Sequence, residues 1–97
     1  MPIAIQKKSQ ALVNRLAPRV DRLSFADSRR LTDAYLSLSN FYISQGRLDL
    51  ALVTIEDALG LLPESTELID SLAGIHARYA ALYKEVARRQ RASQKKP

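Results

Sequence analysis

Two runs of helical periodicity meet at a single break, and this arrangement limits the fold more than any other feature of the sequence. The apolar members of the two runs are Tyr35, Leu38 and Tyr42 before the break and Ala51, Ile55 and Ala58 after it. Spacings of three and four place each set on one face of a helix. Gly46 marks the break, because glycine reaches the left-handed conformation that ends helices at low steric cost. Pro63 closes the second run, since proline cannot continue a helix. The pattern predicts two helices folded back on each other.

Local signals set approximate limits for this pair of helices. The first should begin near Asp27, because either Ser24 or Asp27 can accept a hydrogen bond from a free backbone N–H of the first turn. The second is expected over residues 48–61. Ala51 and Ala58 lie on its buried side, and their small size lets the two helices approach closely.

This stretch resembles the tetratricopeptide repeat. That repeat asks in order for an aromatic residue, a Leu followed by a small residue, a Tyr, an Ala, a bulky apolar residue and a Pro. Residues 32–65 meet the pattern at nearly every place, with Tyr35 where Trp is usual and Ser39 where Gly is usual. The resemblance covers one repeat, about a third of the chain. It implies a helix–turn–helix scaffold that binds other proteins.

A further helix is expected at the N-terminus, over residues 3–17. Its thin apolar face comprises Ile5, Leu12 and Leu16, and Ser9 interrupts it. Pro18 should end or kink this helix, because proline lacks an N–H and restricts the residue before it. A short helical turn that covers the core is expected to follow, with the apolar residues Val20, Leu23 and Phe25.

The last helix should start after a cap at Ser65 or Thr66 and run to about Arg91. Its stripe alternates spacings of four and three and consists of Leu68, Leu72, Ile75, Tyr79, Leu82 and Val86. The first half should pack on the hairpin as a capping helix. We expect the second half, with Tyr79, Leu82 and Val86, to be a seam for self-association, since nothing in the sequence is placed to cover it. We therefore expect a homo-oligomer or a hetero-complex. The alternative is a monomer in which the N-terminal helix folds back and covers the seam.

Charge is divided unevenly along the chain. Residues 1–30 carry seven basic residues against two acids, residues 31–77 one against seven, and residues 78–97 seven against one. The basic tail contains Arg88, Arg89, Arg91, Lys95 and Lys96. Such a distribution fits an acidic partner or nucleic acid. It also fits contact between a basic end of one copy and the acidic residues 31–77 of another. Nucleic acid is the weaker alternative, because no recognition signature is present and no aromatic residue lies among the charges of the tail.

The residues that catalysis or metal binding would need are few. The chain has no cysteine and one histidine, His76, which sits within a helical pattern. Glu56 and Asp57 are adjacent on a helix and point in different directions, so they do not form a paired-carboxylate site. No metal-ligand spacing appears, and the scattered glycines form no phosphate loop. We expect a protein that is not an enzyme and that uses no cofactor or metal.

The family resemblance also implies a binding groove, because tetratricopeptide proteins hold peptides or helices along their first helices. The residues that would face it are Asp33, Leu36, Asn40, Ile43, Ser44, Asp70, Gly74 and Arg78. Asn40 looks like the asparagine that many members use to hold a peptide backbone, since an amide both donates and accepts. The alternative is that the protein's own N-terminal helix fills the groove.

Taken together, the sequence predicts an all-α protein of about four helices, a single domain over residues 1–97 with a frayed basic tail at 92–97. The function expected is that of a small adaptor or chaperone of bacterial type that holds a protein partner. The alternatives are a basic nucleic-acid-binding protein and a structural subunit of a helical assembly. The start of the chain lacks the apolar core of a secretory signal, and no apolar run approaches the length that spans a bilayer. A cytoplasmic protein with no membrane partner is therefore expected.

Overall fold

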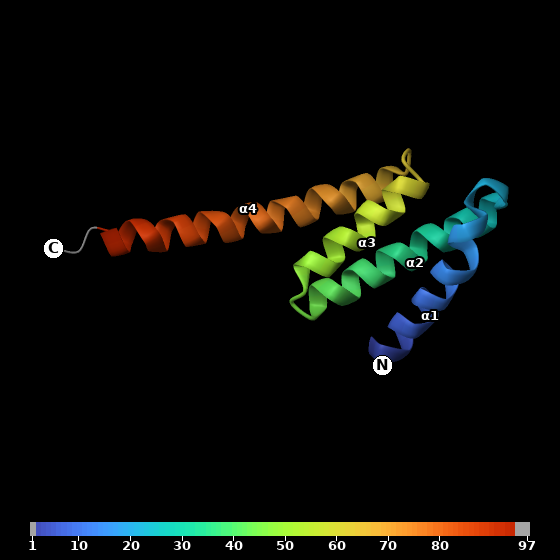
Figure 1. Cartoon of the computed structure of the whole chain (residues 1–97), viewed down its shortest axis with the longest axis horizontal. Helices are drawn as coiled ribbons and strands as arrows, with labels where there is room; N and C mark the ends of the chain where they lie inside the picture. Colours follow the sequence, from blue (N-terminus) through green and yellow to red (C-terminus); the bar gives the residue numbers. More distant parts are fainter. Residues whose placement is uncertain (1, 95–97) are drawn as a thin grey trace.

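The structure, a computed structural model, describes the backbone of residues 2–94 and the side chains of residues 6–94. This part of the chain folds into four α-helices and one 3-10 segment, without strands. In order they are α1 (Pro2–Leu16), η1 (Ala17–Arg22), α2 (Phe25–Ser44), α3 (Leu48–Leu61) and α4 (Thr66–Gln94) (Figure 1). The predicted all-α fold is confirmed. The side chain of Ile5 and residues 95–97, with Lys95 and Lys96 of the basic tail, lie outside the described residues.

The first three helices pack in series, and α4 leaves them. α2 contacts α1 on one side and α3 on the other, while the N-terminal half of α4 lies along α3 (Figure 1). α4 has 29 residues and continues well beyond the α2–α3 turn, so the described part of the molecule measures 64 × 30 × 16 Å. The fold therefore consists of a packed body and a projecting arm. The arm is the part of α4 that continues beyond the α2–α3 turn.

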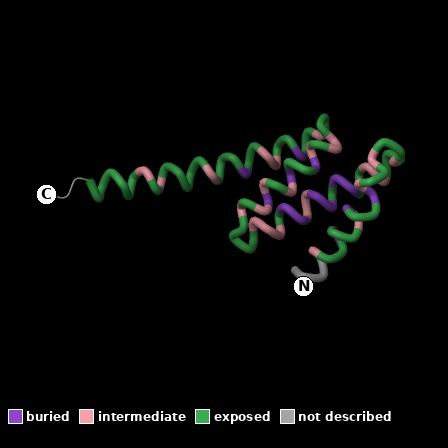
Figure 2. Tube along the Cα trace, viewed as in Figure 1, coloured by how far each residue is buried: buried purple, intermediate pink, exposed green. Residues whose placement is uncertain are grey.

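The core follows α2 and is shared by α1, α3 and the first half of α4 (Figure 2). The fully buried side chains there include Leu31, Ile55, Leu68 and Ile75. Ala51 and Ala58 on α3 are also wholly buried, and so is Ser39 on α2. Small residues at these places let α2 and α3 pack closely, as the spacing of the sequence predicted.

Each helix boundary has a local cause. Ser24 caps α2 by accepting a hydrogen bond from the backbone N–H of Asp27 at 3.1 Å. Gly46 adopts a φ of +72°, the left-handed conformation expected of it at the α2–α3 turn. At the start of α4, the Ser65 hydroxyl accepts from the backbone N–H of Leu68 at 3.4 Å. At two of the three boundaries, therefore, the hydroxyl of one serine accepts the capping hydrogen bond.

The N-terminal segment differs from the prediction in two places. Ser9, expected to interrupt the apolar face of α1, is itself buried together with Val13 and Leu16. Phe25 was expected to cover the core, and this is wrong, because its side chain is 89% exposed. It is the first residue of α2 and lies six residues before Leu31, which places it about 120° around the helix from the buried stripe. Val20 and Leu23 do pack against the core.

The arm is helical although none of the other described helices packs along it (Figure 1). It is rich in alanine, arginine and other strong helix formers, and it contains no glycine or proline. Glu85 receives hydrogen bonds from both Arg88 and Arg89, at 2.7 and 3.2 Å, and such pairs one turn apart support a helix. α4 consequently reaches Gln94, three residues past the predicted end at Arg91.

Candidate functional site

An apolar notch lies at the corner where α4 leaves the body. Its volume is about 480 Å³. The residues around it are Ile43, Gly46 and Leu48 from the end of α2, the turn and the start of α3, with Arg78, Ala81 and Leu82 from α4. The notch exists because the helical hairpin ends at Gly46 while α4 runs on past it. Among the described residues of this lining, Arg78 alone carries a charge.

Of the residues predicted to form a binding groove, the structure brings Ile43 and Arg78 together at this notch. Leu36 lies half-buried against the core of the body. Asn40, Ser44 and Asp70 are exposed, as is Gly74. The Ser44 hydroxyl donates to the backbone carbonyl of Phe41 at 2.6 Å, within its own helix.

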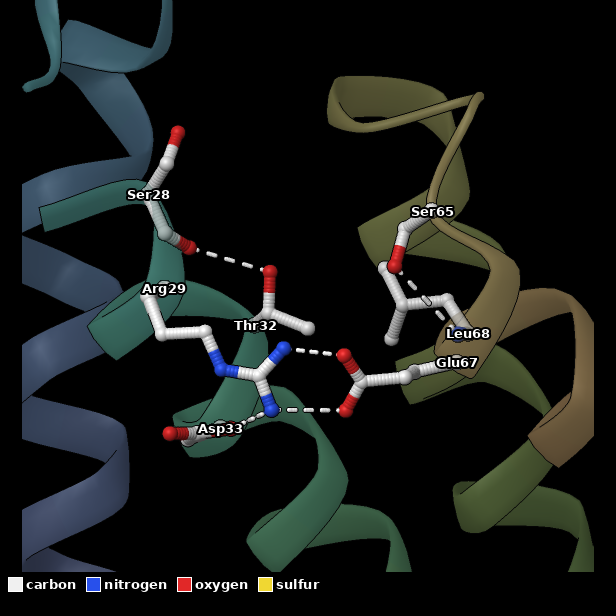
Figure 3. Close-up of polar contacts among 7 residues, drawn as sticks. All are labelled: Ser28, Arg29, Thr32, Asp33, Ser65, Glu67 and Leu68. Carbon is white, nitrogen blue, oxygen red and sulfur yellow. Dashed lines mark hydrogen bonds and ion pairs between the residues drawn. The ribbon is translucent and has the colours of Figure 1, made fainter. Parts of the chain in front are cut away.

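Asp33, also assigned to the groove, belongs to an ion-pair cluster that joins α2 to α4 (Figure 3). The guanidinium of Arg29 contacts a carboxylate oxygen of Asp33 at 3.0 Å. It also donates to both carboxylate oxygens of Glu67 on α4, one of them at 2.7 Å. These hydrogen bonds from Arg29 lower the pKa of Glu67 below its ordinary value, and the bond to Glu67 raises that of Arg29. The cluster anchors the first turn of α4 to α2.

Sequence reasoning missed Arg29 and Glu67. Arg29 precedes the apolar stripe of α2 by two residues, and Glu67 lies 38 positions away in the chain. The available signal was weak: Glu67 and Asp33 are 34 residues apart, which is the length of the repeat that residues 32–65 resemble. Acids at corresponding places of such a repeat would favour a cation between them.

α1 packs against α2 on the side away from α3 (Figure 1). A second cavity of about 330 Å³ lies between these helices. Its lining consists of Lys8, Ser9 and Leu12 from α1 with Arg30, Asp33, Ala34 and Ser37 from α2. α1 thus packs along the side of α2 that carries Ala34 and Ser37, whereas Asn40 remains exposed. Among the described side chains, none from α1 lines the notch at the other end of α2.

The three seam residues on α4 lie in different surroundings. Leu82 is 54% exposed and lines the notch. Tyr79 packs partly against the core, and its ring stacks on that of Tyr83 with the centroids 6.1 Å apart. Val86 is 50% exposed on the arm. Leu82 and Val86 are four residues apart in α4, so they lie on the same side of the helix.

The basic residues of the arm are exposed. Arg88 and Arg89 both form ion pairs with Glu85, at 2.7 and 3.2 Å. Arg91 is exposed in the same segment. Among the described residues, no group of three or more His, Cys, Asp or Glu side chains gathers as metal ligands would. No helix within residues 2–94 is long and apolar enough to cross a membrane.

Comparison of the chain with protein-family models, curated proteins and solved structures gives no significant match. The resemblance to the tetratricopeptide repeat therefore depends on the residue pattern of the hairpin alone.

Proposed function

We propose that this protein is a small interaction module, an adaptor or chaperone, that holds a segment of a partner protein at the notch and along the adjoining face of α2. The observation that carries the proposal is the notch itself. The described residues of its lining are apolar except for Arg78, and it is open to the surface at the junction of three helices. Concave apolar surfaces with one or two placed polar groups are the usual form of a binding site.

The lining indicates the chemistry of the segment that fits. Ile43, Leu48 and Leu82 offer contacts to an apolar side chain, and Ala81 leaves room for it. Arg78 can donate to a carboxylate, because its guanidinium presents a planar set of N–H groups that matches carboxylate geometry. The expected segment therefore carries a bulky apolar residue next to an acid. Asn40 and Leu36 extend this surface along α2, because the resemblance to the tetratricopeptide repeat assigns both residues to the binding groove.

Alanine residues on α4 provide a matched pair of variants to test the site. Ala81→Glu fills the notch with a charged side chain, whereas Ala77→Glu places the same change one turn earlier on an exposed surface outside the lining. Affinity capture from the native host with mass spectrometry should recover a protein partner with wild type and Ala77→Glu. Ala81→Glu should lose it, and Asn40→Ala and Leu36→Asp should weaken it.

Thermal melts of all four variants separate loss of binding from loss of fold. If Ala81→Glu melts like wild type and still recovers the partner, the notch is not the binding site. If Leu36→Asp unfolds the chain, Leu36 belongs to the core and the surface along α2 is narrower than proposed.

Nucleic acid is a second candidate because three arginines are exposed on the projecting arm. Arginine and lysine neutralise phosphates and release counterions, so binding of this kind falls steeply with salt. The same capture at low and moderate salt distinguishes the two. A protein that remains bound at moderate salt supports the adaptor, and recovered nucleic acid that is lost with salt supports the alternative.

A further inference from the structure

The N-terminal corner of the fold gathers arginines that have no acidic partner. This corner comprises residues 15–25, which hold the last turn of α1, all of η1 and the first residue of α2. Arg15, Arg19 and Arg22 are exposed there, and none of them forms an ion pair with a described carboxylate. Asp21 is the one acid among residues 15–25, and it is exposed as well. The corner therefore carries positive charge that the fold does not neutralise.

An aromatic side chain lies at the same corner. Phe25 follows Arg22 by three residues, and its side chain is 89% exposed, more than any other large apolar side chain that the structure describes. Its backbone is held at the start of α2, directly after the capping residue Ser24. An aromatic ring has a flat face on which another ring can stack. The corner thus combines unpaired cations with an accessible aromatic ring.

We propose that the N-terminal corner binds single-stranded nucleic acid, with the arginines on the phosphates and Phe25 stacked on a base. Arginine neutralises phosphates and releases counterions, and its planar guanidinium matches the geometry of a phosphate. Stacking on an aromatic side chain tolerates any sequence, because every base has a π face. Unpaired bases can leave their own stack and offer that face to the protein, so a single strand satisfies both features of the corner.

A hollow of about 300 Å³ extends the site along α1. It is lined by Lys8, Ala11, Leu12 and Arg15. Lys8 and Arg15 are seven residues apart, so they lie on one side of the helix and about 10 Å apart along its axis. Lys8, like Arg15, forms no ion pair with a described carboxylate. Because Arg15 is in the last turn of α1, the hollow begins beside η1 and offers a strand further cations past the corner.

An anionic membrane would attract the same cations, but the apolar surface of the corner does not suit it. Helices that lie in a membrane surface carry an apolar face turned outward. The apolar face of α1, with Val13 and Leu16, is buried in the body instead. Phe25 is the one large apolar side chain that is exposed among residues 6–44. A single ring among polar groups suits stacking on a base better than insertion into lipid.

The basic residues of the arm form a poorer site for a single strand. Arg88 and Arg89 share the carboxylate of Glu85, and no aromatic residue follows Tyr83 in the chain. The arm and the N-terminal corner lie at opposite ends of the molecule (Figure 1), so substitutions test them separately. The corner is also remote from the notch, and the inference is independent of the binding proposed there.

Fluorescence anisotropy of a labelled single-stranded oligothymidylate, titrated with the full chain at several salt concentrations, tests the site. The logarithm of wild-type affinity should fall linearly with the logarithm of salt concentration, and Arg19→Gln or Arg22→Gln should make that slope shallower by about 0.7. Phe25→Ala should weaken binding at least about fivefold at every salt concentration and leave the slope unchanged, because stacking releases no counterions. Asp21→Asn should strengthen binding, since it removes a charge that repels phosphate.

Two variants outside the corner are matched controls. Val53→Ala shortens another exposed apolar side chain, on α3, and Arg91→Gln makes the same charge change on the arm. Both should leave the affinity and the slope as in wild type. All the substituted side chains are exposed, so thermal melts of every variant should match wild type and separate loss of binding from loss of fold.

Several results would overturn the proposal. They are the absence of binding by wild type, wild-type affinity in Phe25→Ala, and a slope that changes with Arg91→Gln but not with Arg19→Gln. Equal affinity for a duplex of the same length would also count against it, because Phe25 would then have no role. Binding to phosphatidylserine vesicles without binding to the oligonucleotide would assign the corner to a membrane instead. None of these results would affect capture of a partner at the notch.

Discussion

Replacing Ala51 by leucine tests the packing of the α2–α3 hairpin at a fully buried position. Ala51 has no exposed surface, and Ile55 and Ala58 beside it on α3 have none either. The added carbon atoms have no empty space to enter, so α2 and α3 must move apart or adopt strained side-chain conformations. Overpacking of this kind costs roughly 1–3 kcal/mol. A domain of this size has a total unfolding free energy of about 5–15 kcal/mol, so the change removes a large share.

The effect is measurable as a change in melting temperature. A destabilisation of 1 kcal/mol lowers the Tm of a small domain by about 4–8 °C, so Ala51→Leu should lower it by roughly 10 °C. Ala77→Leu is the control, because it makes the same change on the exposed surface of α4. Thermal denaturation followed by circular dichroism compares the two. Equal melting temperatures for wild type and Ala51→Leu would refute the close crossing of α2 and α3.

Two further predictions concern polar groups in the body. Ser39→Ala should raise the free energy of unfolding by about 1 kcal/mol in chemical denaturation, because the Ser39 hydroxyl is buried without a hydrogen-bond partner among the described residues; a loss of stability would mean that this hydroxyl is satisfied. Glu67 has a lowered pKa in the folded protein, so its ion pair with Arg29 stabilises the fold above the ordinary glutamate pKa of 4.5 and is lost as the pH falls through the folded value. The Tm of Glu67→Gln should therefore lie below that of wild type at neutral pH and converge with it on acidification, and a difference that persists in acid would contradict the role of the ion pair.

The sequence predicted the helices well because their boundaries depend on local chemistry. Ser24, Gly46 and Ser65 act on backbone groups within a few residues of themselves, and the apolar spacing in between is regular. Long, periodic helices with clear end signals need little information from the rest of the chain. For the same reason the predicted limits of α3 agree with the observed Leu48–Leu61.

The remaining features depend on how helices pack, which spacing alone does not specify. Phe25 was predicted to cover the core because it is apolar, but its position around α2 leaves the side chain exposed to solvent. The contact of Arg29 with Glu67 joins residues from two helices. The notch arises from the different lengths of the hairpin and α4, so Ile43 and Leu82 meet only once the whole body is assembled.

Hydrogen–deuterium exchange of the chain with its captured partner tests the notch most directly. Exchange reports local opening, and a segment with few neighbours opens readily until a ligand covers it. If the partner binds as proposed, amides in residues 43–48 and 78–82 should exchange more slowly in the complex than in the chain alone, while those of η1 should be unchanged. Protection confined to residues 2–22 or to residues 88–94, with none at the α2–α3 turn, would contradict the proposed binding site.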